Sequence, residues 1–126
     1  MDERSATINL DGVQYELLLT TKATREIAKR YGGLENLGEQ LMKAENFEMA
    51  LDEVIALIVL LANQPIQIYN LKHPNDQREL LTTELVELLT SPYDLAEYKD
   101  AIMEAMVRGT KRNVESEDDG KNTVAG

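Results

Sequence analysis

The sequence of 126 residues contains no cysteine and no tryptophan, and it has only one phenylalanine and one histidine. The lack of cysteine excludes disulfides, thiolate nucleophiles and cysteine-based zinc sites. Because aromatic residues make up only 5% of the chain, a hydrophobic core must consist mainly of Leu, Ile, Val, Ala and Met. The composition therefore predicts one domain with an aliphatic core, which suits a chain of this length.

Basic residues are scarce as well, since 13 Lys and Arg stand against 23 Asp and Glu and give a formal net charge of −10. Nucleic-acid binding needs clustered positive charge that neutralises phosphates, so this balance argues against a nucleic-acid partner. It favours solubility or a basic protein partner. The N-terminal stretch lacks the apolar region of a signal peptide, and we therefore expect a cytoplasmic protein.

No residue pattern in the chain is typical of catalysis. The single histidine, His73, lies beside Pro74 in a turn-like cluster, and no second His or Cys is present to complete a metal site with it. A Ser-His mechanism would need Ser5, Ser91 or Ser116, of which two lie near the termini and Ser91 is explained below as a helix cap. The carboxylates are scattered over polar helix faces. We expect no enzyme activity, no metal and no cofactor.

The stretch 5–19 is predicted to form a β-hairpin, because apolar and more polar residues alternate along it. Asp11 and Gly12 supply the two positive-φ positions of a type I′ turn. Pairing around this turn places Leu10 opposite Val13, which makes one face of the hairpin apolar. An isolated hairpin is marginal in water, so it must pack on the helices or extend a sheet of another subunit.

Two short helices are expected next. Thr20 and Thr21 are candidate N-caps for a helix that ends near residue 31, where Gly32-Gly33 provides the C-cap. A phosphate-binding loop is the alternative for the glycine pair, but it lacks the flanking Lys-Ser/Thr and the preceding strand. The second helix is expected over 34–44.

The stretch 47–63 is predicted to be the central helix, with Asn46 as its cap. Residues 54–62 include no polar side chain, so this half of the helix must be covered on every side. Val59 and Leu60 lie opposite the expected core stripe and need cover from later helices or from a second subunit. The helix would span about 25 Å and begins with acidic residues, so we expect no membrane span.

Pro65 is expected to break or kink this helix, and the sequence leaves both outcomes open. Ile66 and Tyr69 would then begin a new segment that ends at the turn-like cluster 73–76.

A further helix is expected over 80–89, capped by Thr82 or Thr83. Its inward face is predicted to consist of Leu81, Leu85, Leu88 and Leu89.

The last helix is predicted to begin at Ser91-Pro92, with Ser at the N-cap, Pro at N1 and Asp94 at N3, and to run to about residue 108. Its inward face is predicted to consist of Leu95, Tyr98, Ile102, Ala105 and Met106. Beyond it the periodicity ends. The expected fold is mainly α with a small N-terminal β-hairpin (α+β), a helical bundle around a central apolar helix. We expect a single domain over 1–110 and a disordered acidic tail over 111–126.

The order of these features resembles the tail assembly chaperones of long-tailed phages and prophages of Gram-positive bacteria. The residues that carry the resemblance are INLDGVQYELLLT (8–20), REIAKRYGGLENLGEQL (25–41), EVIALIVLLANQPIQIYN (53–70) and ELLTTELVELLTSPYDLAEYKDAIMEAM (79–106). It implies a non-enzymatic protein of the host cytoplasm, absent from the mature virion. Such a protein would bind and solubilise the tape-measure protein and help recruit subunits of the major tail-tube protein.

Partner contacts in such a chaperone are expected at Val59, Leu60, Ile66 and Tyr69, together with the hairpin edge. Two other functions stay open. A small acidic regulator, such as an inhibitor or an antitoxin, would bind a basic partner through its Asp and Glu faces, and salt would weaken that binding. A structural tail component would remain in purified particles. Homo-oligomerisation also stays open.

Overall fold

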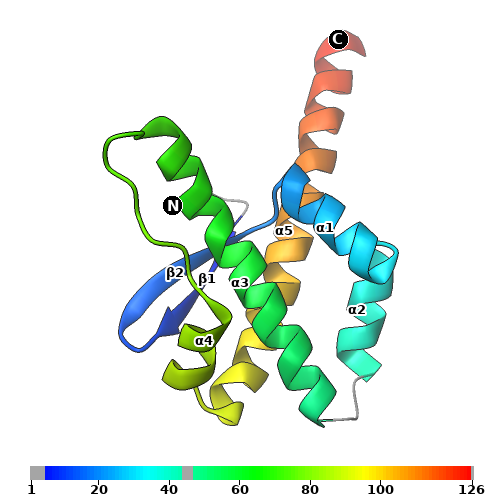
Figure 1. Ribbon diagram of the computed structural model, residues 1–126. Coiled ribbons are helices and arrows are strands. Elements are labelled where there is room, and N and C mark those ends of the chain that lie inside the picture. Colours follow the sequence, from blue (N-terminus) through cyan, green and yellow to red (C-terminus); the bar gives the residue numbers. More distant parts are fainter. Residues whose placement is uncertain (1–4, 44–46, 126) are drawn as a thin grey trace.

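The chain forms a two-stranded antiparallel sheet packed against helices (Figure 1). The computed structural model describes the backbone of residues 5–43 and 47–125, and the side-chain surroundings of residues 5–37, 39 and 51–110. This arrangement confirms the predicted mainly α fold with an N-terminal hairpin. In chain order the elements are β1 (Ser5–Leu10), β2 (Val13–Leu18), α1 (Thr21–Tyr31), α2 (Leu34–Lys43), α3 (Phe47–Lys72), α4 (Thr83–Leu89) and α5 (Pro92–Ala125).

The hairpin turn has the predicted conformation, since Asp11 and Gly12 both have positive φ, at 51° and 83°. Leu10 pairs with Val13 across the turn, and the two strands belong to the same chain. The Gly12 N–H donates to the Asn9 side-chain oxygen at 2.9 Å. A two-residue I′ turn matches the twist of the strands, so this short sequence is enough to set the register of the whole hairpin.

Helices α3 and α5 cover the hairpin, with α3 against β2 and α5 against β1. The Tyr98 hydroxyl on α5 donates to the Asn9 carbonyl, and Arg108 donates to the Ser5 carbonyl at 3.0 Å. Burial raises the pKa of the Tyr98 hydroxyl. The predicted inward face of α5 is confirmed, because its five residues are all buried: Leu95, Tyr98, Ile102, Ala105 and Met106.

The caps of α1 and α5 are those that the sequence predicts. Thr20 accepts from the Ala23 N–H at 3.0 Å, and Gly32 ends α1 in the left-handed conformation. Ser91 and Asp94 exchange hydrogen bonds in a reciprocal capping box at the start of α5. The predicted cap Asn46 lies outside the described residues.

Helix α3 runs without a break from Phe47 to Lys72, with Pro65 inside it. A full break at Pro65 is therefore excluded, and the predicted separate segment after it is part of α3. The helix has 26 residues, so the expected length of about 25 Å was too short. By length and composition alone Leu51–Lys72 could cross a membrane, a test that the buried core helix of a soluble domain also passes.

Helix α4 is rotated relative to the prediction. Leu81 is buried as expected, but it lies before the helix, which rests on the core through Val86. Leu85, Leu88 and Leu89 were predicted to face inward and are exposed instead. The helix has only 7 residues, so one buried residue is enough to anchor it on the core. Because Leu81 precedes the helix, its burial does not indicate which side of the helix faces inward.

Helix α5 continues past residue 108 to Ala125, which differs from the predicted disordered tail over 111–126. In Figure 1 its C-terminal turns project away from the other elements. No proline interrupts the sequence after residue 92, and extending an existing helix adds one hydrogen bond for each residue that is fixed. The domain limit at residue 110 stays a prediction.

Candidate functional site

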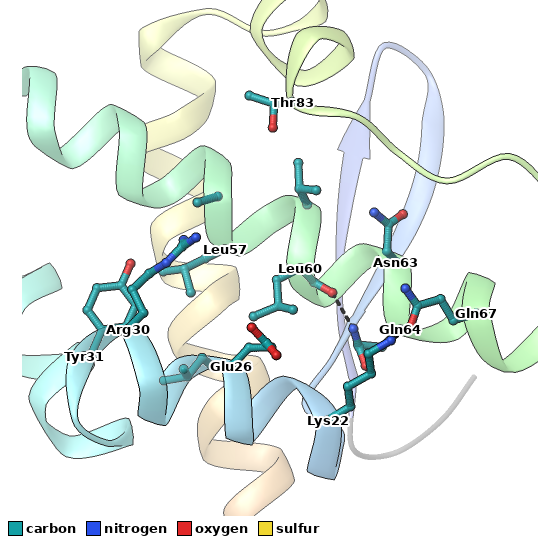
Figure 2. A pocket seen from close by; sticks show the side chains of 13 residues that line it. Lys22, Glu26, Arg30, Tyr31, Leu57, Leu60, Asn63, Gln64, Gln67 and Thr83 are labelled. Carbon is teal, nitrogen blue, oxygen red and sulfur yellow. Dashed lines mark hydrogen bonds between the residues drawn. The ribbon is translucent and has the colours of Figure 1, made fainter.

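A groove of about 400 Å³ lies between α1 and α3. Figure 2 shows Leu57 and Leu60 of α3 at its centre, facing the side of α1 that carries Glu26. Val59 and Leu60 are partly exposed in the groove, although the neighbouring turns of α3 are buried. We call this the α1–α3 groove; its lining residues are Lys22, Glu26, Ile27, Arg30, Tyr31, Ala56, Leu57, Val59, Leu60, Asn63, Gln64, Gln67 and Thr83.

The α1 wall of the groove is charged, because Lys22, Glu26 and Arg30 recur every four residues and so share one side of the helix. All three side chains are exposed. Lys22 donates to the side-chain oxygen of Gln67 on α3 at 3.0 Å, which ties the two helices together at one end of the groove. The result is an apolar floor under a rim of mixed charge.

A buried glutamine fixes the two helices relative to each other. The Thr20 hydroxyl donates to the Gln64 side-chain oxygen at 2.5 Å, and the Gln64 amide donates to the Leu60 carbonyl at 2.9 Å. Gln64 is buried, and these bonds satisfy both ends of its amide. Because Thr20 is also the N-cap of α1, the same residue sets the start of α1 and its distance from α3.

The Tyr31 side chain lines the other end of the groove, and its buried hydroxyl has no hydrogen-bond partner among the described residues. The residue is 8% exposed. Buried hydroxyls are nearly always paired, and leaving one unpaired costs about 1–3 kcal/mol. The hydroxyl is therefore a buried, unsatisfied polar group beside the groove.

The predicted contact residues do not form one surface. Val59 and Leu60 both line the α1–α3 groove. Ile66 lies on a different side of the domain, in a hollow of about 380 Å³ between β2 and α3. Tyr69 belongs to a third place, near the end of α3. Only the first pair is brought together, and the role of all four in partner binding stays a prediction.

Tyr69 is enclosed by residues of its own chain. The His73 ring stacks on the Tyr69 ring with 3.9 Å between centroids, and the Arg78 guanidinium carbon lies 3.7 Å from the same centroid. Two planar groups this close to one ring must occupy opposite faces. The Tyr69 hydroxyl donates to the Asp76 carboxylate, which raises the pKa of Tyr69. The ring therefore holds the loop after α3 in place.

Two asparagines on α3 hold the extended segment that leads to α4. The Asn63 side chain donates to the Leu81 carbonyl at 2.8 Å and accepts from the Leu81 N–H at 2.7 Å. Asn70 does the same for Arg78, at 2.9 and 2.7 Å. Seven helical residues rise about 10.5 Å, and three extended residues span about 10 Å, so the two spacings match. We call these contacts the asparagine clamps.

Sequence reasoning missed the asparagine clamps, the role of Gln64 and the Tyr31 hydroxyl. The one available signal was that Asn63 and Gln64 are amides at the end of an apolar helix face, where buried polar groups need partners. The partners themselves are 18 and 44 residues away in sequence. No local pattern identifies partners at such distances.

The described residues contain no group of three His, Asp or Glu side chains that could hold a metal ion. The arrangement offers an apolar floor and a charged rim, which are the elements of a binding surface. Comparisons with models of protein families, with curated proteins and with solved structures found no match to this chain.

Proposed function

We propose that this protein is a tail assembly chaperone of a long-tailed phage or prophage, without enzyme activity. In the host cytoplasm it would bind the tape-measure protein, keep it soluble and help recruit tail-tube subunits. Two things support the proposal: the resemblance in the order of sequence features, and the α1–α3 groove. The groove is the observation that carries it, because there the most apolar stretch of the chain stays partly open.

The physical task of such a chaperone fits a small acidic domain. The resemblance implies a partner that is long, helical and partly apolar, and that would aggregate if left uncovered. A helix of such a partner would place an apolar stripe on Val59 and Leu60, between the charged side chains of α1 and the amides of α3. Each bound copy would add a net charge of −10, and the resulting repulsion would oppose self-association of the complex.

The unpaired Tyr31 hydroxyl lies buried at one end of the groove, where a partner would reach it only if binding opens that end. A partner carbonyl or side chain that reaches it would gain a hydrogen bond at a position where water is largely excluded. Replacing Tyr31 with Phe removes this bond and leaves the shape of the ring unchanged. We expect Tyr31→Phe to weaken partner binding while leaving the fold intact, since it removes a hydroxyl that has no partner among the described residues.

The test is co-expression with the tape-measure protein encoded nearby, followed by pull-down and a solubility assay. The proposal expects the tape-measure protein to be soluble only with this chain bound, in several copies per partner. Leu60→Ser should abolish the effect. Leu71→Ser is the matched control, because Leu71 also lies on α3 but outside the groove and is 83% exposed. Circular dichroism of both variants checks that they fold.

A tape-measure protein that still precipitates, with no complex formed, would contradict the proposal. Equal loss of solubility with Leu60→Ser and Leu71→Ser would contradict the role of the groove. Binding to a basic protein that falls steeply with added salt, with no effect on the tape-measure protein, would favour an acidic regulator. Presence of the chain in purified particles would favour a structural tail component.

A further inference from the structure

The turn between α4 and α5 carries a cluster of exposed apolar side chains. Four large hydrophobic residues within residues 85–93 are exposed, with exposed fractions between 40% and 74%. Single exposed leucines are normal on protein surfaces, but a contiguous group marks a contact surface. We call this group the α4–α5 corner; it consists of Leu85, Leu88, Leu89 and Tyr93.

The helical phase of α4 explains why the corner is exposed. Val86 is fully buried and anchors the helix on the core. Leu85, Leu88 and Leu89 are spaced i, i+3 and i+4, so they lie together on another side of the helix. Tyr93 follows in the first turn of α5 and is 74% exposed. The corner therefore presents a short apolar ridge of the kind that packs against a second helix.

The surroundings of the corner are acidic. Residues 79–98 include no Lys or Arg and five carboxylates: Glu79, Glu84, Glu87, Asp94 and Glu97. Among the described residues, none of these five lies in an ion pair with Lys or Arg. Glu84 and Glu87 belong to α4 itself and are exposed beside the leucines. An apolar ridge with unpaired carboxylates along it is complementary to an apolar stripe bordered by positive charge.

We propose that the α4–α5 corner docks an amphipathic helix of a partner protein, with an apolar stripe flanked by Lys or Arg. A second copy of this chain does not fit, because a symmetric contact would bring Glu84 and Glu87 against the same two carboxylates of the other copy. The segment 115–119 of this chain, which has four acidic residues, would be repelled in the same way, and so would an anionic membrane surface.

This inference goes beyond the proposed function, because the corner shares no residue with the α1–α3 groove. It names the chemistry of a second contact and does not depend on which protein fills the groove. A chain with both surfaces would be able to hold two partners at once.

The test uses the full chain and synthetic helical peptides in a binding titration at low salt. The first peptide has a leucine stripe with lysine elsewhere. The second has the same stripe with glutamate in place of lysine, and the third has the composition of the first in a scrambled order without a stripe. The first should bind at least about tenfold more tightly than either of the others, because only it matches both the ridge and the charge.

Variants locate the binding site on the chain. Leu88→Ser with Tyr93→Ser should lower the affinity for the first peptide by about tenfold or more, since each removes apolar area from the contact. Both side chains are mostly exposed, so the fold should be preserved. The matched control is Leu71→Ser with Val107→Ser, two exposed apolar residues outside the corner, which should leave the affinity unchanged.

The charge contribution is tested separately with Glu84→Gln and Glu87→Gln, which should lower the affinity several-fold and weaken its dependence on salt. The control pair is Glu35→Gln and Glu39→Gln, two exposed carboxylates on α2 that lie outside both the corner and the groove. Equal binding of the striped and scrambled lysine peptides would overturn the proposal, and so would equal effects of the corner and control variants. Concentration-dependent dimerisation that Leu88→Ser abolishes would also overturn it, in favour of a second copy.

Discussion

The two halves of α3 on either side of Pro65 are held in place by different forces. Before the proline, the helix is fixed by burial, since Val54, Leu57, Ile58 and Leu61 are almost completely enclosed. After it, no side chain of residues 66–72 is fully buried. That half is held by hydrogen bonds and ring contacts to the loop that follows.

The difference matters because the two kinds of contact differ in strength. Burial of a large aliphatic side chain contributes about 1.5–3 kcal/mol, whereas a hydrogen bond in contact with water contributes a net 0.5–1.5 kcal/mol, roughly. We therefore infer that the second half of α3 opens together with the loop at a lower free energy than the first half unfolds. The four predictions below test this division.

The largest effect is expected in the first half. Leu61→Ala removes a fully enclosed side chain of α3 and should lower the free energy of unfolding by about 2–5 kcal/mol. Urea denaturation followed by circular dichroism measures this change. Leu71→Ala, in the exposed second half, should change it by less than about 0.5 kcal/mol. Similar losses at the two positions would refute the division.

The buried asparagine clamp comes next. Asn63→Ala leaves the N–H and carbonyl of Leu81 without partners at a buried position, and it should lower the free energy of unfolding by about 1–3 kcal/mol. Asn63→Asp keeps the acceptor for the N–H but places a carboxylate against the carbonyl, so it should not rescue the loss. Denaturation of both variants decides the matter; wild-type stability of Asn63→Asp would argue against the clamp.

A smaller effect is expected for the same change at the second clamp. Asn70 holds the backbone of Arg78 at an exposed position, where water replaces the lost bonds. Asn70→Ala should therefore lower global stability by only about 0.5–1 kcal/mol. Amide hydrogen exchange should show faster exchange confined to the end of α3 and the loop. Loss of protection in the first half of α3 would mean that the two halves open as one.

The smallest effect concerns Tyr69 and appears only at alkaline pH. Its hydrogen bond to Asp76 favours the neutral hydroxyl and raises its pKa in the folded protein above the ordinary value of 10.0. The associated stability is present below about pH 10 and is lost as the pH rises through the folded pKa. Unfolding of wild type and Tyr69→Phe should differ slightly at neutral pH and converge at higher pH. A difference that grows with pH would contradict this assignment.

Local chemistry was enough to predict the turns and caps. Asp11-Gly12 fixes the hairpin, Thr20 starts α1, and Ser91 with Asp94 starts α5. Each depends on residues within three or four positions of one another, so the pattern contains both partners. The inward face of α5 was predicted for the same reason, because its helix is long enough for the 3.6-residue period to emerge.

Long-range choices were not predictable in this way. The sequence gives α4 two apolar sides, and only the position of Val86 against the core decides which one is buried. Pro65 signals a break, yet packing of the helix before it and the loop contacts after it keep α3 continuous. In the candidate site, the sequence was enough to single out Val59 and Leu60. The apolar run in α3 covers more of the helix surface than one core face can bury. The polar contacts of Gln64 and Tyr31 depend on neighbours that no local pattern specifies.

The matched spacing of the asparagine clamps restricts how this region can vary in length. One residue inserted between Asn63 and Asn70 would turn the second amide by 100° around the helix, roughly, and move it about 1.5 Å along the axis. The deletion of one residue between Arg78 and Leu81 would shorten the extended segment by about 3.3 Å. Either change would leave only one clamp able to close. The turn at residues 73–77 lies between Asn70 and Arg78, where a change in length alters neither spacing, so homologous chains should accommodate their insertions and deletions there.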